Sequence, residues 1–216
     1  MACLLALAAS PSLAVAQAAT EAATRPVDAG WILDKLARPA PMRTPFVELR
    51  DSPMLKAPLR IEGLYARPDE DTLVREVRAP YAETTTLRAG EASIARDGRA
   101  PRRFSLSRAP ELASLQASFG AMLSGDRAAL EQSYRIDTRG TRQRWTMTLA
   151  PKDAQLAARV RDIVLHGRGA ELRCIETRPA KGEVQRTLLA GAAREAAGAT
   201  DAAALAALCR QDSKTG

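Results

Sequence analysis

The chain has 216 residues, of which 46% are hydrophobic, and this length and composition predict one domain with a core of its own. Lys and Arg outnumber Asp and Glu by 32 to 25, a net charge of +7 that allows attraction to anionic lipid surfaces or nucleic acid. The basic residues are spread along the chain, which favours a basic solvated surface, and the arginines of residues 96–103 predict a hairpin turn rather than a nucleic-acid platform.

The N-terminal segment is typical of an export signal. Residues 1–19 contain no charged side chain and end in small residues, as a secretory signal peptide does. Such a peptide normally begins with Lys or Arg, and none precedes Arg25, so we expect the true start to lie upstream of Met1. Residues 20–27 are predicted to be a linker, and no later segment is apolar enough to span a membrane. We therefore expect a soluble exported protein.

A short amphipathic helix is predicted over residues 27–37. Trp31, Ile32, Leu33 and Leu36 recur close to helical spacing, and Asp28 is placed as an N-terminal cap. The apolar side of this helix is explained by core packing or by a lid that lies across a sheet.

About eleven strands are predicted in two groups, over residues 44–106 and 132–189. The short runs alternate polar and apolar residues and are separated by Pro or Gly, which favours an antiparallel meander. One face of the sheet is apolar, because residues of one face recur at every second position; this face includes Ile61, Tyr65, Phe104, Trp145 and Met147.

Helices interrupt the strands in the middle of the chain. Leu112, Leu115, Phe119 and Met122 share one helix face, and Gly125 is placed where that helix would end. Asp126 is placed to cap a second short helix. Core packing is the majority explanation of this stripe.

The alanine-rich tail, residues 190–216, permits two interpretations: a short helix begun by Thr200 or Asp201, or a loosely held extension. Cys174 and Cys209 are the cysteines outside the signal segment. In an oxidising compartment they could form a disulfide; otherwise Cys174 is a buried small hydrophobe and Cys209 an exposed thiol.

The sequence offers little reactive machinery. His166 is the single histidine, which excludes a zinc site built on several imidazoles, and no nucleophile elbow or glycine-rich phosphate loop occurs. The acidic run 69–71 predicts a solvated turn rather than a metal loop. We therefore expect a binding protein rather than an enzyme, with no cofactor and no metal.

Several segments resemble the LolA-type outer-membrane lipoprotein carriers, in their divergent LolA-related branch. They are "PFVELR" with Phe46, "GLYARPD" with Gly63, Arg67 and Pro68, "LEQSYRIDTRGTRQRWTMTLAPKD", and "VRDIVLHGRGAELRCIE". The resemblance covers residues 28–189 and leaves residues 190–216 unaccounted for. It implies an α+β, mostly β fold: a single antiparallel half-barrel of about eleven strands whose concave apolar face is covered by helices.

The same resemblance implies a periplasmic, monomeric carrier that shields lipoprotein acyl chains between an inner-membrane release complex and an outer-membrane acceptor. The matching arginine, Arg67, would latch the sheet to backbone carbonyls of a lid helix; a solvated pair with Asp69 or Glu70 is the alternative. The expected cavity and lid residues are Trp31, Leu33, Leu36, Phe46, Ile61, Tyr65, Leu73, Phe104, Leu112, Leu115, Phe119, Met122, Trp145 and Met147.

The resemblance is incomplete at one point, because family carriers follow the Arg-Pro with an aromatic-rich strand. Here Asp69, Glu70 and Asp71 intervene and aliphatic residues follow, so the cargo is a lipoprotein, another lipid or an aryl polyene. Two other functions stay open: a periplasmic sensor of lipids or mislocalised lipoproteins that signals through a membrane partner, and a small esterase or thioesterase that uses His166.

Overall fold

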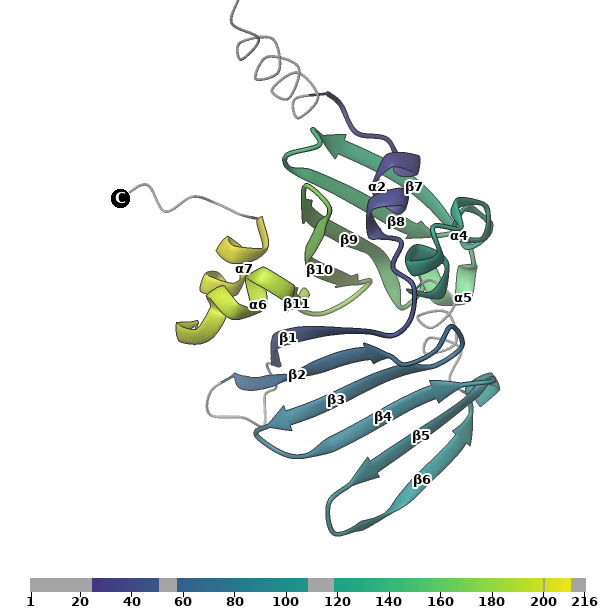
Figure 1. Cartoon of the computed structure of the whole chain (residues 1–216), viewed down its shortest axis with the longest axis vertical. Coiled ribbons are helices and arrows are strands. Elements are labelled where there is room, and N and C mark those ends of the chain that lie inside the picture. Colours follow the sequence, from purple (N-terminus) through teal and green to yellow (C-terminus); the bar gives the residue numbers. More distant parts are fainter. Residues whose placement is uncertain (1–24, 51–57, 109–118, 200, 211–216) are drawn as a thin grey trace, which may run out of the picture.

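The structure is a computed structural model that describes residues 25–50, 58–108, 119–199 and 201–210. Its framework is one antiparallel sheet of eleven strands (Figure 1). The strands are β1 (Met42–Arg50), β2 (Leu59–Arg67), β3 (Leu73–Ala79), β4 (Glu83–Arg88), β5 (Glu91–Arg96), β6 (Arg99–Ser105), β7 (Tyr134–Gly140), β8 (Trp145–Pro151), β9 (Val160–Arg168), β10 (Glu171–Pro179) and β11 (Gln185–Leu189).

The first and last strands meet in the middle of the sheet. The spatial order is β6-β5-β4-β3-β2-β1-β11-β10-β9-β8-β7, and Phe46 of β1 lies opposite Leu189 of β11. The strands β6 and β7 therefore form the two edges, and the sheet stays open rather than closing into a barrel. The predicted mostly β fold, an antiparallel half-barrel of about eleven strands with helices, is confirmed.

Alternation of side chains explains why the sheet has two distinct faces. In β8 every second residue is buried, beginning with Trp145 and Met147. Gly63 in β2 allows a close approach of its neighbours, because a Cβ atom there would lie 1.9 Å from the backbone oxygen of Glu76 and 2.9 Å from the Phe46 ring. A larger residue at position 63 would force β2 and β3 apart.

Helices near the N-terminus and in the middle of the chain pack on the concave face. Helix α2 (Ala29–Leu36) begins at Asp28, whose carboxylate accepts a hydrogen bond from the Trp31 amide at 3.0 Å, so the predicted helix and cap are confirmed. Residues 119–124 form a helical segment that ends at Gly125, whose φ is +72°. Helix α4 (Arg127–Ser133) follows, capped by Asp126, and α5 (Ala154–Ala157) is a single turn between β8 and β9.

The C-terminal segment covers the opposite, convex face at the centre of the sheet (Figure 1). It comprises α6 (Ala190–Glu195), a 3-10 turn (Ala196–Gly198) and α7 (Ala202–Arg210), and the Asp201 carboxylate accepts a hydrogen bond from the Ala204 amide. A disulfide joins Cys174 of β10 to Cys209 of α7. The helix begun by Asp201 is confirmed, and the alternatives of a loose extension and of two unpaired cysteines are wrong for these described residues.

The concave and convex sides of the sheet each have their own hydrophobic core, because different helices pack on each side. The larger core fills the concave side and includes Ile32, Leu33, Phe46, Ile61, Trp145 and Met147. A second core joins Val47, Cys174 and Leu188 to the alanines of α6 and to Leu205 and Cys209 of α7. A small third cluster of Leu87, Ala92 and Leu106 lies near β6; Leu106 belongs to the 3-10 turn Leu106–Arg108. Each face of the central strands is thus packed against its own set of helices.

Candidate functional site

Two neighbouring cavities lie between the concave face and the helices that cover it. One has a volume of about 340 Å³ and the other about 950 Å³. Both volumes are typical of small-molecule sites, which occupy about 300–1,000 Å³. The cavities share four lining residues, Arg67, Leu73, Phe119 and Leu123, so they meet where β2 ends and β3 begins.

The smaller cavity has mostly apolar walls contributed by both halves of the sheet and by the covering helices. These walls include Leu36 of α2, Met42 of β1, Leu73 of β3, Phe119, Met122 and Leu123 of the helical segment 119–124, Leu172 of β10 and Leu189 of β11. Such walls offer few hydrogen-bond partners, so they suit an apolar chain rather than a polar group. Arg38, Arg43 and Glu171 supply charge to the same lining.

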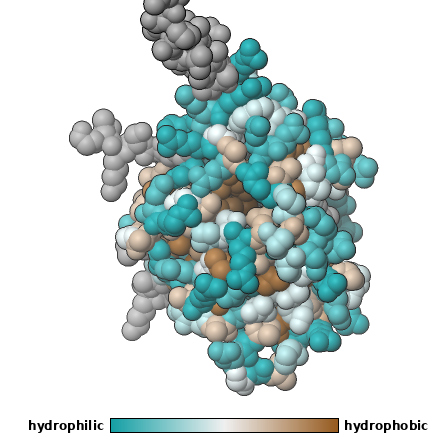
Figure 2. Space-filling view, in the orientation of Figure 1, coloured by the Kyte–Doolittle hydropathy of each residue, from teal (hydrophilic) through white to brown (hydrophobic). Residues whose placement is uncertain are grey.

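The larger cavity is amphipathic. Leu73, Leu106, Phe119 and Leu123 form its apolar part, and Thr72, Arg88, Ser105 and Ser107 are among its polar residues. A ligand that spans both cavities would meet apolar walls in the smaller one and hydroxyl and guanidinium groups in the larger one. Figure 2 shows patches of apolar surface in the middle of one face of the molecule, with hydrophilic residues around them.

Arg67 ties the sheet to the segment that leaves α2. Its guanidinium is buried, and Nη1 donates a hydrogen bond to the Arg38 carbonyl oxygen at 3.0 Å. Nη2 forms an ion pair with the Glu70 carboxylate and donates to the Glu70 carbonyl oxygen at 3.3 Å. Arg38 follows the last residue of α2 by two positions. The carbonyl contact and the Glu70 pair, which the sequence analysis offered as alternatives, therefore coexist, and the carbonyl belongs to the helix exit rather than to the helix.

The Glu70 and Arg38 contacts extend this tie to the covering helices. The other Glu70 oxygen, Oε1, accepts a hydrogen bond from the Ala40 amide at 3.1 Å. The Arg38 amide donates to the Leu123 carbonyl oxygen at 3.0 Å. The Arg67 guanidinium thus joins the end of β2 to the exit from α2, and the Arg38 backbone joins that exit to the helical segment 119–124. These three segments are boundaries of the smaller cavity.

An aromatic cluster with a buried ion pair forms the wall beside the cavity. The Phe46 and Tyr65 ring centroids are 4.8 Å apart, and the Tyr65 and Phe119 centroids are 6.2 Å apart. Arg75 lies over the Phe46 ring at 4.7 Å and donates to Glu48 Oε1 at 2.5 Å. Burial raises the pKa of Tyr65 above its ordinary value, and Arg75 opposes this only in part. The phenol therefore stays neutral at any physiological pH.

The predicted site residues fall into three groups: those that line a cavity, those that fill the concave core, and those that lie farther away or outside the described residues. Leu36, Tyr65, Leu73, Phe119 and Met122 line a cavity, as does Arg67. The side chains that fill the concave core and line neither cavity are Leu33, Phe46, Ile61, Trp145 and Met147.

The remaining predicted residues lie farther from the cavities or cannot be placed. Trp31 is partly buried and packs on the concave core, with Arg142 over its ring at 5.3 Å. Phe104 packs on the small cluster near β6. Leu112 and Leu115 lie outside the described residues.

Sequence reasoning missed half of the apolar lining. Met42, Leu106, Leu123, Leu172 and Leu189 all line a cavity and were not among the predicted site residues. Alternation along β1 and β11 could have assigned Met42 and Leu189 to the apolar face. Leu172 could not be assigned in this way, because the register of β10 shifts between Leu172 and Cys174. Leu123 follows Met122, and only the packing of segment 119–124 shows that both reach the cavity.

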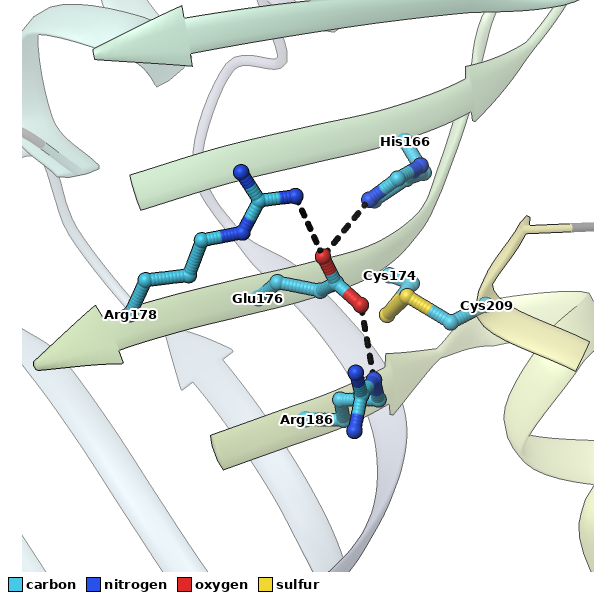
Figure 3. The surroundings of a disulfide bond; sticks show 6 residues. All are labelled: His166, Cys174, Glu176, Arg178, Arg186 and Cys209. Carbon is cyan, nitrogen blue, oxygen red and sulfur yellow. Dashed lines mark hydrogen bonds and ion pairs between the residues drawn. A yellow bond between two sulfur atoms is a disulfide. The ribbon is translucent and has the colours of Figure 1, made fainter. Parts of the chain in front are cut away.

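The single histidine lies on the opposite face of the sheet from the cavities. His166 of β9 pairs in register with Cys174 of β10, whose side chain belongs to the convex core. Its Nε2 lies 3.4 Å from Glu176 Oε2, beside the disulfide (Figure 3). This position gives the esterase alternative no support, because the imidazole is buried away from the candidate site.

Glu176 is the most strongly perturbed carboxylate of this face. Arg186 Nε donates to its Oε1 at 2.7 Å, and Arg178 Nη2 donates to its Oε2 at 3.1 Å (Figure 3). The contact with His166 contributes most, ahead of Arg186 and Arg178, to lowering the pKa of Glu176 to about 2 despite its burial. Glu176 is therefore ionised, and its charge is balanced within the fold.

The geometry of the concave face agrees with a comparison of the whole chain with known families. The family described as outer membrane lipoprotein carrier protein LolA-like matches residues 21–212. The chain belongs to this LolA-like family. The match includes residues 190–212, so the C-terminal helices, which the resemblance over residues 28–189 left unaccounted for, are part of the LolA-like region.

Comparisons with solved structures include one distant LolA superfamily protein. No curated protein matches this LolA-like chain. It is similar to the crystal structure of LolA superfamily protein NE2245 from Nitrosomonas europaea, with 13% identity and a TM-score of 0.40, over 76% of this chain and 92% of that one. Among the described residues, no helix combines the length and the apolar character that crossing a membrane requires.

Proposed function

We propose that this LolA-like protein is a periplasmic carrier that shields the acyl chains of lipoproteins, or of a related lipid, in transit from the inner to the outer membrane. The observation that carries the proposal is the pair of adjoining cavities on the concave face, apolar where they meet and closed at one side by the Arg67 tie. The family match supports the class of cargo, and the cavities support the place where it binds.

The energetics of acyl chains explain why a carrier is needed. Each methylene removed from water contributes about 0.8 kcal/mol, so a long acyl chain does not leave a membrane at a useful rate unaided. Walls built mainly from Leu and Met suit chains of varied length, because these side chains change rotamer without leaving polar groups unpaired. The ring of tied segments around the smaller cavity supports a covering that opens and closes while the sheet stays folded.

The proposal assigns no catalytic role to the chain. Its cargo partners are acyl chains, and an inner-membrane release complex and an outer-membrane acceptor are the partners that carriers of this family imply. We propose that the carrier acts as a monomer.

The test is lipid and protein mass spectrometry of the natively purified full chain. We expect co-purifying acylated protein or lipid, and we expect Leu73→Gln to retain at least about tenfold less, since burial of one Leu side chain is worth about 1.5–3 kcal/mol and 1.4 kcal/mol is a factor of ten. Leu73 is suited to this test because it lines both cavities.

The matched control is Leu208→Gln on α7. Leu208 is likewise partly buried, but it packs against the convex core. The Leu208→Gln variant should bind as much cargo as the unmodified protein does. Absence of lipid and of acylated protein from the unmodified chain, even after cross-linking in cells, would count against the proposal, as would equal cargo in both variants.

A further inference from the structure

A compact group of metal-ligand side chains lies on the convex face and plays no part in the cargo site. Nε2 of His166, a carboxylate oxygen of Glu176 and Sγ of Cys209 all lie within 4.8 Å of one another, and all three residues are buried. Cys174 is bonded to Cys209, so a second sulfur adjoins the group (Figure 3). The side chains come from β9, β10 and α7, three elements that meet only in the folded protein.

We propose that reduction of the Cys174–Cys209 disulfide converts this group into a site for one Zn²⁺ ion, held by both sulfurs, His166 and Glu176. Two Cys ligands, one His and one carboxylate use the donor atoms that zinc takes in proteins. This inference is independent of the cargo proposal, because it concerns the other face of the sheet.

The ligand atoms can surround one ion after the disulfide opens and the cysteine side chains rotate. Zinc–sulfur bonds of about 2.3 Å and zinc–nitrogen or zinc–oxygen bonds of about 2.0–2.2 Å place the ligand atoms of a tetrahedral site roughly 3.3–3.8 Å apart. The His166 Nε2 and Glu176 Oε2 atoms already have that separation, at 3.4 Å. The ligand atoms of His166, Glu176 and Cys209 lie within 4.8 Å of one another, so these three atoms have to approach by about 1 Å. The two sulfurs are bonded in the disulfide and have to move apart before both can bind one ion, which rotation of the cysteine side chains allows once the bond is reduced.

The unsatisfied nitrogen of His166 is a second, separate observation. The His166 residue is 8% exposed, and among the described residues its Nε2 makes no hydrogen bond of good geometry, although Glu176 Oε2 lies 3.4 Å away. Buried side-chain nitrogen atoms are usually paired. A cation bound at Nε2, beside the Glu176 carboxylate and the Cys209 sulfur, would satisfy this nitrogen.

The surrounding charges favour the ion once both sulfurs are thiolates. Two thiolates and the Glu176 carboxylate carry three negative charges, one more than Zn²⁺ neutralises. Arg178 and Arg186, which already contact Glu176, lie in position to balance the excess. A carboxylate has about four acceptor positions, so Glu176 can keep its arginine contacts while one oxygen turns to the metal.

The redox step is ordinary thiol chemistry. A dithiol reductant gives two electrons and two protons to the disulfide and becomes a disulfide itself, which leaves two thiols in the protein. Each thiol loses its proton to solvent as its sulfur binds the ion. Helix α7 has nine residues, too few to be stable alone, so loss of the disulfide loosens it and admits the ion. The bound metal then holds α7 on β10, as the disulfide does.

The experiment uses Co²⁺ as a spectroscopic probe with the full chain, purified oxidised and then reduced. We expect the reduced protein to bind one equivalent with the visible bands of tetrahedral cobalt and a thiolate charge-transfer band, and the oxidised protein to show neither. Zn²⁺ should displace the cobalt and slow the alkylation of Cys174 and Cys209 by N-ethylmaleimide.

The matched variant is His166→Asn, which keeps both cysteines and can be checked for folding by circular dichroism while still oxidised. We expect it to bind Co²⁺ at least about tenfold more weakly and with an altered spectrum, because even outer-shell partners of a metal are worth about 10–100-fold in affinity. Glu176→Gln serves as a second variant if the first does not fold. Equal affinity and an equal spectrum in the variant would overturn the proposal, as would no binding by the reduced unmodified protein.

Discussion

At the scale of single residues, Arg67 is the side chain that connects the sheet to its covering. A planar guanidinium with five donors can serve a carboxylate and two carbonyl oxygens at once, which a lysine cannot do with the same geometry. Arg67 uses this capacity on Glu70 and on the Arg38 carbonyl. The position just before Pro68 places it where strand pairing stops, so its side chain is available to the α2 exit.

We predict that Arg67→Leu leaves the fold intact and accelerates cargo exchange by about tenfold. Hydrogen bonds to a charged group contribute about 1.5–3 kcal/mol each, and their loss lowers the cost of opening the covering. The measurement is the rate at which the loaded protein releases a fluorescent fatty acid to acceptor vesicles. Arg60→Leu is the control, because Arg60 also donates to a carbonyl oxygen, that of Ala199 at 2.6 Å, but reaches the C-terminal segment. An unchanged release rate in the Arg67→Leu variant would mean that Arg67 does not hold the covering closed and serves only as the ion-pair partner of Glu70.

A second residue-scale prediction concerns pH and Glu176. Its pKa is about 2 in the folded protein and about 4.5 when unperturbed, so its contribution to stability is complete above pH 4.5 and is lost as the pH falls toward 2. The shift corresponds to an effect on the order of 3 kcal/mol. Chemical denaturation at pH 7 and pH 3 should therefore show a steeper loss of stability in the unmodified protein than in Glu176→Gln.

Glu76→Gln provides the comparison for that experiment. The pKa of Glu76 is also lowered, mainly by its hydrogen bond to Arg78, but the pair is solvent-accessible and contributes little. Its removal should hardly change the slope of stability against pH. The same slope in all three proteins would show that Glu176 does not govern the acid response.

At the scale of elements, the position of each strand in the sequence was easier to predict than the strand with which it pairs in the sheet. Alternation and the breaks at Pro and Gly identify each strand locally, as in residues 145–151. The pairing of β1 with β11 joins segments about 140 residues apart, as the contact between Glu48 and Thr187 shows, and no local pattern encodes it. The half-barrel was therefore expected from the family resemblance rather than from the pattern.

The sequence pattern could predict which face of the sheet carries the site, but not which residues of that face line a cavity. Ile61 and Tyr65 share one face of β2, yet Ile61 is fully buried in the core and Tyr65 lines the smaller cavity. The difference depends on which part of the face the helices cover closely, and helix placement is a tertiary property. The disulfide is a similar case, because only the docking of α7 brings Cys209 to Cys174.

At the scale of the whole molecule, the two faces of the sheet differ in how completely they are packed. The concave face is incompletely filled, since cavities of about 340 and 950 Å³ adjoin its core. The convex face at the centre of the sheet is packed by α6 and α7 and held by a covalent bond. A covering that opens on one face of a sheet leaves the central strands together if the other face is fixed. We infer that the C-terminal helices stabilise the seam between β1 and β11 while cargo moves on the opposite side.

This division predicts that stability and cargo binding can be changed separately. Cys209→Ala removes a disulfide that closes a loop of 35 residues, which should lower the free energy of unfolding by about 3–4 kcal/mol. The amount of bound cargo should stay unchanged below the new melting temperature, because the substitution lies across the sheet from the cavities and distant sites act independently. Leu73→Gln should do the reverse, with little change in melting temperature and a large loss of cargo. Loss of cargo in folded Cys209→Ala would mean that the convex face controls the shape of the cavities and that the two faces are coupled.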